Sequence, residues 1–187
     1  MLIRACYAII RFIKRTELAI QNSISRFYHH VVTRQAFKRI GVFNEGFASV
    51  ELKNGRWSYI NLLGKPFDGD FAFCESFNNG AGRVKIDENR WNFVNKKGKI
   101  ISDVEFIDAS DFSCGWGLVT LADRRYNYIN SKGKMLSETG FPHAASFFSN
   151  GLAMVVLDDE RLVVINNRGD IINTMRDASG NFFLPPW

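Results

Sequence analysis

The sequence has few of the residues that most often build metal centres, disulfide frameworks and catalytic sites. Its 187 residues include 3 cysteines, 3 histidines and 4 prolines. Cys6, Cys74 and Cys114 stand far apart and form no CxxC pair, which argues against a zinc site and a disulfide framework. His29 and His30 are adjacent, and adjacent residues point to different sides of a helix, so they are poor joint ligands. We therefore predict no metal site and no cofactor.

Motifs for catalysis are also missing. The sequence contains no phosphate-binding glycine loop and no serine nucleophile motif. Two acidic clusters, Asp68–Asp70 and Asp158–Glu160, lack the loop pattern of a calcium site, and we interpret them as solvated turns. We expect no catalytic residue, and the chain is predicted not to be an enzyme.

Acidic residues are nearly missing from the first forty positions. That segment holds eight basic residues against Glu17 alone, a charge of +7, so the remaining residues carry −2 of the total of +5. A nucleic-acid-binding surface needs a basic patch or stripe. Nucleic acid is therefore not an expected partner of the rest of the chain.

The basic N-terminal segment is predicted to be an amphipathic helix over residues 1–35. Its apolar residues recur near the 3.6-residue helical period, with Ile9, Ile13 and Ile20 among them. The basic residues of this helix that would contact a partner or a membrane are Arg4, Arg11, Lys14, Arg15 and Arg26. Because such charges interrupt the apolar run, a transmembrane span is excluded.

Three roles of this helix are open. The favoured one is a cap whose apolar stripe covers an end or a face of the domain that follows. The second is an amphipathic helix that binds an anionic membrane surface. The third is a targeting presequence, because the segment is rich in arginine and almost free of acidic residues.

The strongest feature of the sequence is a block that occurs four times. Each copy has a glycine, a large apolar residue eleven positions later, an asparagine four further on and a second glycine three after that. The four copies are 46–64, 80–98, 115–133 and 151–169. They step by 34, 35 and 36 residues, whereas the spacing inside the block is constant. A fixed period of this size predicts a repeat architecture, whose units bury their apolar faces against their neighbours.

Within the block, the pattern is that of a β-hairpin. In the first copy, side chains of two kinds alternate over 47–52, Asn54-Gly55 marks a tight turn, and 56–61 forms a second strand. The Asn-x-x-Gly ending predicts another turn, in which glycine takes a left-handed conformation. Gly80-Ala81-Gly82 occupies a strand position, which we explain by close packing of the backbone.

Phenylalanines six residues apart precede each block and fix where the array begins. The pairs are Phe37 and Phe43, Phe71 and Phe77, Phe106 and Phe112, and Phe141 and Phe147. We therefore predict a mostly β domain over residues 36–175, an array of four β-hairpin repeats that is solenoid-like or partly closed. The helical segment 1–35 precedes it, and a C-terminal tail, 176–187, follows.

The repeat resembles the WG (KWG) β-repeats that are common in bacterial proteins. The similarity rests on FNEGFASV, RWSYINLLGK and RWNFVNKKGK, and it covers roughly residues 36–172. The glycine that follows tryptophan in that family is replaced here by Ser58, Asn92, Asn127 and Val163, which marks a divergent member. The resemblance implies a β-rich interaction or scaffold module rather than an enzyme. The hairpins are also similar, in part, to bacterial cell-wall-binding and choline-binding repeats, which hold sugars or choline between stacked aromatic rings.

A ladder of aromatic residues is the candidate binding surface. Its members are Trp57, Tyr59, Trp91, Phe93, Tyr126 and Tyr128. Exposed rings would stack on sugars or grip a peptide. The favoured alternative is that the same rings form the continuous core that a repeat array needs. The fourth unit replaces the ring pair with Leu162 and Val164, as expected of a terminal repeat, and we expect the helix or the tail to cover it.

The function we predict from the sequence is a non-enzymatic repeat module for protein–protein interaction or scaffolding. The expected partner is another protein. The alternatives are a glycan or cell-envelope binder that uses the aromatic ladder, and a peripheral membrane protein that uses the N-terminal helix. We expect a cytoplasmic location, with the membrane periphery as the alternative.

Overall fold

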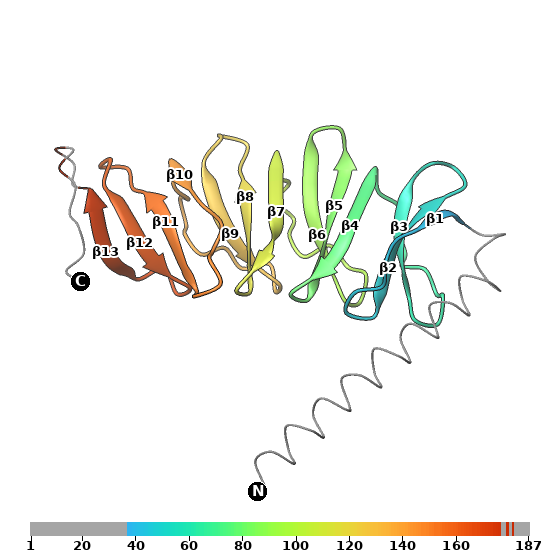
Figure 1. The fold of residues 1–187 in the computed structure, drawn as a ribbon. Coiled ribbons are helices and arrows are strands. Elements are labelled where there is room, and N and C mark those ends of the chain that lie inside the picture. Colours follow the sequence, from blue (N-terminus) through green and yellow to red (C-terminus); the bar gives the residue numbers. More distant parts are fainter. Residues whose placement is uncertain (1–36, 177–178, 180, 182–187) are drawn as a thin grey trace, which may run out of the picture.

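The described part of the chain is a row of four antiparallel sheets (Figure 1). The computed structural model describes residues 37–176, 179 and 181, and no helix occurs among them. The first sheet contains β1 (Phe37–Ile40), β2 (Phe47–Leu52) and β3 (Trp57–Asn61). The second contains β4 (Phe73–Asn78), β5 (Ala81–Asp87) and β6 (Arg90–Asn95). The third contains β7 (Asp108–Ser113), β8 (Trp116–Thr120) and β9 (Tyr126–Asn130). The fourth contains β10 (His143–Ala144), β11 (Leu152–Val156), β12 (Leu162–Asn166) and β13 (Ile171–Arg176).

This architecture confirms the mostly β prediction and its four repeat units. The first and fourth sheets lie at opposite ends of the row (Figure 1). The predicted helix over 1–35, with Arg4, Arg11, Lys14, Arg15 and Arg26, lies outside the described residues. The same holds for nine of the twelve residues of the tail 176–187.

Each of the first three sheets has a short additional edge. After β3, the chain returns along the same strand, and Trp57 and Phe71 exchange backbone hydrogen bonds, both of 2.7 Å. The second and third sheets repeat this pairing between Trp91 and Phe106 and between Tyr126 and Phe141. In the fourth sheet, β13 occupies this position as a full strand beside β12. The connections between units therefore belong to the sheets instead of looping away from them.

Two kinds of turn lie at one end of every sheet. The first contains the leading glycine of the block, and Glu45-Gly46 has two consecutive positive φ angles, 50° and 88°. The second is the predicted Asn-x-x-Gly turn, in which Asn61 Oδ1 accepts the N–H groups of Leu63 and Lys65 at 2.9 and 3.0 Å. Phe47, at the start of β2, pairs with Asn61 at the end of β3, so both turns lie at the same end. We call it the turn end.

Hydrogen bonds at the turn end connect each unit to the next. Asn44 Nδ2 donates to the carbonyl of Phe77 at 2.7 Å. Asn79 Nδ2 donates to the carbonyl of Phe112 at 3.0 Å, and the Ser113 hydroxyl donates to the carbonyl of Phe147 at 2.7 Å. The turns of successive units therefore lie side by side.

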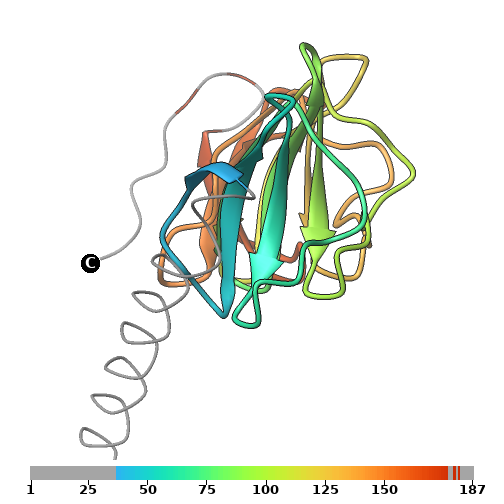
Figure 2. The ribbon, with the colours of Figure 1, turned by 90° about the vertical axis from the view of Figure 1, so that its right-hand side faces the viewer.

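The core lies between successive sheets, which stack face to face along the row (Figure 2). We call the side of a sheet that meets the next unit its forward face. Tyr59 projects from the forward face of the first sheet and packs with Phe77 and Val84 of the second. Tyr128 of the third sheet packs in the same way against the fourth. Period-two alternation sends the intervening residues to the opposite face, where they meet the preceding unit.

Forward-face rings lie directly on the backbone of the next sheet. A Cβ atom added to Gly82 would lie 2.7 Å from Tyr59 Oη and 2.8 Å from its Cζ. At Gly117, an added Cβ would lie 2.8 Å from the ring atoms of Phe93 and Phe112. These distances confirm the predicted close packing at Gly82 and extend it to Gly117. The prediction is wrong for Gly80, which precedes β5 with a φ of 88° and where an added Cβ would have no neighbour within 4 Å.

The residues that replace the family's glycine fasten the returning segment to its sheet. The Ser58 hydroxyl donates to the carbonyl of Gly69 at 3.0 Å. Asn92 Nδ2 donates to the carbonyls of Ser102 and Val104 at 2.9 and 3.1 Å. Both side chains are buried. Carbonyl groups that are shielded from water need such donors, so these polar side chains satisfy backbone groups of the returning segment.

The fourth unit has an exposed apolar surface where the other units have a neighbour. Val164 takes the position of Tyr128 on the forward face, beside Met154. Met154 and Ile172 are 37% and 56% exposed. The helix and the tail that we expected to cover this unit lie outside the described residues.

Candidate interaction surface

The inner members of the predicted aromatic ladder are core residues. Tyr59, Phe93 and Tyr128 are each 0% exposed. The prediction that they form a binding surface is wrong for these three rings, because each lies between two stacked sheets. The favoured interpretation of them as core is the one that the structure supports. The Tyr59 hydroxyl donates to the carbonyl of Glu75 at 2.6 Å, which satisfies it inside the core.

Burial also controls the chemistry of this interior. It raises the pKa of the Tyr59 and Tyr128 hydroxyls above their ordinary value of about 10, so both stay neutral in the folded protein. Burial likewise raises the pKa of the Cys74 thiol. A thiol that keeps its proton is a poor nucleophile, so Cys74 acts as a small apolar core residue.

The outer members of the ladder remain accessible in part. Trp57, Trp91 and Tyr126 are half-buried, two residues before the inner rings and on the same face. They lie toward the end of the sheets that is opposite the turn end. We call this opposite end the hairpin end, and its turns are 53–56, 87–90, 122–125 and 158–161. Each ring stands at the junction of two units. Their role in binding stays a prediction.

The outer rings contact both apolar and cationic neighbours. The rings of Trp57 and Phe73 meet edge to face, with their centroids 5.1 Å apart. Over Trp91 stand the Arg83 guanidinium and the Lys85 ammonium, 5.1 and 5.6 Å from the ring centroid. Such contacts hold a ring in one orientation while part of its surface stays open.

An arginine precedes the outer residue in every unit, and the sequence interpretation did not include these arginines in the candidate binding surface. The row consists of Arg56, Arg90, Arg125 and Arg161. Each forms an ion pair: with Asp70, with Asp87 and Glu105, with Asp158, and with Asp159 respectively. The signal was present, because the basic residue before tryptophan recurs in phase with the block.

Arg125 shows how this row connects neighbouring units. Its Nη1 and Nη2 atoms donate to the two carboxylate oxygens of Asp158 at 2.7 and 3.1 Å. The same guanidinium donates to the carbonyls of Thr139 and Gly140 at 2.8 and 2.9 Å. The hydrogen bond with Asp158 raises the pKa of Arg125. The arginine is thus held rigidly beside Tyr126.

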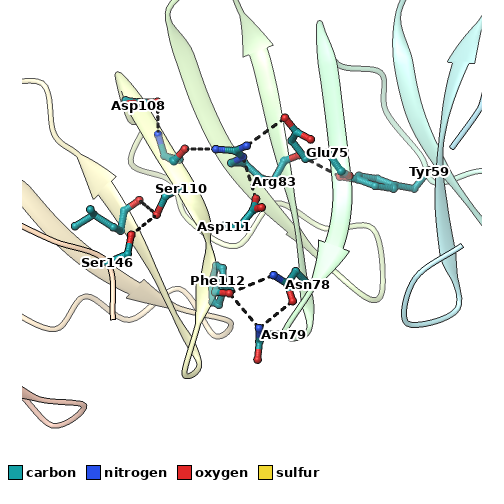
Figure 3. A network of polar contacts seen from close by, with 12 residues as sticks. Tyr59, Glu75, Asn78, Asn79, Arg83, Asp108, Ser110, Asp111, Phe112 and Ser146 are labelled. Carbon is teal, nitrogen blue, oxygen red and sulfur yellow. Dashed lines mark hydrogen bonds and ion pairs between the residues drawn. The ribbon is translucent and has the colours of Figure 1, made fainter. Parts of the chain in front are cut away.

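A second arginine, Arg83, joins the second and third sheets (Figure 3). Its Nη1 atom donates to the carbonyl of Ala109 at 2.6 Å, and Nη2 donates to Glu75 at 3.1 Å. Its Nε atom lies 3.3 Å from Asp111 Oδ1, an ion pair. Arg83 therefore packs over the Trp91 ring while it connects two units.

The described residues contain neither a cluster of metal-binding side chains nor a helix that could span a membrane. Residues 37–176, 179 and 181 hold no group of three or more His, Cys, Asp or Glu side chains that could bind a metal ion. Within the same residues, no helix has the length and apolar character needed to cross a bilayer.

Comparison with known families accounts for the repeat. The WG-containing repeat family matches residues 36–57, 91–123 and 128–160. The chain contains repeats of the WG family. It departs from the family's glycine at Ser58, Asn92, Asn127 and Val163, where the first two side chains fasten the returning segment. Comparison with proteins of curated function found no match.

The solved structures that match this WG-repeat protein have low sequence identity to it. The computationally designed Ika4 protein is 12% identical over 73% of this chain and 94% of its own, with a TM-score of 0.40. BamB from Moraxella catarrhalis is 11% identical over 76% of this chain and 49% of its own, with a TM-score of 0.38. The WD40 β-propeller domain of Doa1 is 14% identical over 72% of this chain and 53% of its own, with a TM-score of 0.34. The chain thus spans nearly all of Ika4 and about half of the other two proteins.

Proposed function

We propose that this WG-repeat protein is a non-enzymatic interaction module that binds another protein. The binding surface is the outer aromatic row, which consists of Trp57, Trp91 and Tyr126, together with the arginine that precedes each ring. The observation that carries the proposal is the repetition of one half-buried ring and one fixed arginine at three successive junctions. Tryptophan, tyrosine and arginine are the residue types most enriched among energetically dominant interface positions.

The rigidity of the row supports this proposal. Arg83, Lys85 and Arg125 are held by ion pairs, carbonyl groups or a ring, so little side-chain freedom would be lost on binding. A ligand that spans several units would gain from several such positions at once. An extended segment of a partner protein has the length to do so.

The test compares two triple variants of the full chain. Trp57→Ala/Trp91→Ala/Tyr126→Ala removes the row, and Met154→Ala/Ile171→Ala/Ile172→Ala removes the same kind of exposed surface elsewhere. Quantitative affinity capture should recover proteins that bind the wild type and the control variant but not the row variant. Circular dichroism and the unfolding midpoint establish that each variant is folded. Unchanged capture by a folded row variant would reject the proposal.

The alternative of a glycan-binding protein depends on the same three rings, and it differs from the proposal above in the kind of ligand that they bind. Its support is the partial exposure of Trp57, Trp91 and Tyr126. A glycan array probed with wild type and row variant would favour it if sugars bind the first only. The alternative of a peripheral membrane protein through the helix 1–35 stays a prediction from the sequence.

A further inference from the structure

The turn end is basic, although the overall composition of the array gives no sign of a basic surface. Six lysines lie in or just after the Asn-x-x-Gly turns: Lys65, Lys96, Lys97, Lys99, Lys132 and Lys134. All six are exposed, and Arg168 extends the set into the fourth unit. The acidic residues in the turns at this end are Glu45, which pairs with Lys96 at 3.0 Å, and Asp170. Among the described residues, the other five lysines have no ion pair.

The hairpin end is different. Its four turns contain equal numbers of basic and acidic residues, as in the third and fourth turns, where Asp123 and Asp158–Glu160 stand beside arginines. The returning segments add Asp68, Asp70 and Glu105 near the same end. The array therefore has a net charge near zero, and its excess of basic residues is concentrated at the turn end. Folding, and not composition, produces the basic surface.

Exposed apolar side chains stand among the turn-end lysines. Val42, Leu63 and Phe148 are 83%, 78% and 50% exposed. Leu63 occupies the same position of its turn as Lys97, Lys132 and Arg168 do in theirs. Stacked sheets lie about 10 Å apart, so these four tips form a short row in which one apolar residue precedes three cations.

We infer that the turn end docks the protein on an anionic lipid bilayer. Lysines near a bilayer are attracted by the negative surface potential of acidic lipids. Apolar side chains that project beyond the backbone can enter the boundary between headgroups and acyl chains, as on interfacial helices. The inference rests on the array alone and not on the helix 1–35.

The side chains favour a bilayer over a nucleic acid. Recognition of phosphate groups in a fixed geometry favours the planar guanidinium of arginine, whereas this end carries mostly lysine, a flexible point charge. Val42 and Leu63 would gain nothing from a phosphate backbone and would gain burial from lipid. Proteins that bind single strands stack bases on aromatic rings, and the exposed tips here are mainly aliphatic.

The experiment measures binding of the full chain to two kinds of vesicle. One contains phosphatidylcholine alone, and the other contains in addition about a third of phosphatidylserine. Co-sedimentation should detect binding to the second only. Lys97→Glu/Lys132→Glu should weaken it by about tenfold or more, since each charge is reversed at the docking surface. Lys53→Glu/Arg124→Glu makes the same change in charge at the hairpin end and should bind as the wild type does.

A second pair of variants separates apolar insertion from charge. Leu63→Ser should weaken binding and make the remainder fully sensitive to salt, because screening abolishes the electrostatic part alone. Val104→Ser, an exposed change away from the turn end, should leave binding unchanged. Circular dichroism confirms that the variants are folded.

Four results would overturn the inference. If the wild-type protein does not bind acidic vesicles, the turn end is not a membrane-docking surface. Equal binding by wild type and Lys97→Glu/Lys132→Glu would assign binding to another segment, such as 1–35. Equal losses in both charge-reversal variants would assign it to net charge. Binding of duplex DNA without binding of vesicles, lost in Lys97→Glu/Lys132→Glu, would identify a nucleic acid as the ligand. None of these results depends on the outer aromatic row, so the proposed function would stand or fall separately.

Discussion

The inner and outer aromatic rows differ by only two residues along the same strand, yet one is core and the other is surface. Phe93 lies at the middle of a sheet junction with no exposed area, whereas Trp91 lies nearer the hairpin end beneath Arg83 and Lys85. Both rings project from the same face. The comparison teaches that alternation selects the face of a strand, while distance from the end of the sheet decides whether a side chain on that face meets solvent.

The largest expected effect is the loss of an inner ring. Phe93→Ala should lower the free energy of unfolding by about 3–5 kcal/mol, because a large cavity opens between the second and third sheets. Trp91→Ala should cost clearly less, since part of its ring already contacts water. Denaturant titration of both variants measures the difference. Equal losses would mean that the outer row is core as well.

The partner of the inner ring should be nearly as sensitive. Gly117→Ala should destabilise the protein by about 1–3 kcal/mol, because the new methyl group overlaps the rings of Phe93 and Phe112. Thermal unfolding would show the loss. Phe93→Leu in the same chain should restore part of it, and a double-mutant cycle that shows no coupling would disprove the contact.

The buried donor behind each outer ring comes next. Asn92→Ala leaves the carbonyls of Ser102 and Val104 without their donor and should cost about 1–3 kcal/mol. Hydrogen exchange should quicken first in the returning segment near these residues. The exposed change Asn89→Ala is the control, and similar exchange in both variants would contradict this role.

Alkaline pH should test the inner row without a change in volume. Burial raises the pKa of the Tyr128 hydroxyl in the folded protein, whereas the unfolded chain releases this proton near pH 10. Stability is therefore intact below about pH 10 and is lost as pH rises beyond it, by up to about 1.4 kcal/mol per pH unit for each such tyrosine. Tyr128→Phe should flatten this decline in denaturant titrations between pH 9 and 11, conditions chosen to bracket that value. An unchanged slope would argue against protection of the hydroxyl.

The smallest effect is expected in the arginine row. Arg125→Ala removes an ion pair with an exposed carboxylate, and such pairs contribute little to stability. Stability should change little, whereas binding of a protein partner should fall if the row is the interaction surface. A loss of stability equal to that of Phe93→Ala would instead make Arg125 a structural residue.

Much of the fold follows from local patterns in the sequence. The Asn61 turn and the close approach at Gly82 could be predicted because each depends on residues within one unit or on one missing side chain. The depth of Tyr59 and Trp57 could not, because it depends on how the next sheet stacks. The basic turn end was hidden for a related reason. Lys97 and Lys132 stand 35 residues apart, and only the stacking of turns brings them together.

The junction between a forward ring and a glycine has a consequence for how such a chain can lengthen in evolution. A single unit, such as 71–105, carries Gly82 to receive the ring of the sheet before it and Phe93 to occupy the glycine of the sheet after it. A tandem copy of that unit would supply both halves of each new joint. Gene duplication could therefore extend the array one unit at a time without a compensating substitution elsewhere. The same rule would apply to the deletion of this second unit, which leaves the Tyr59 ring facing Gly117.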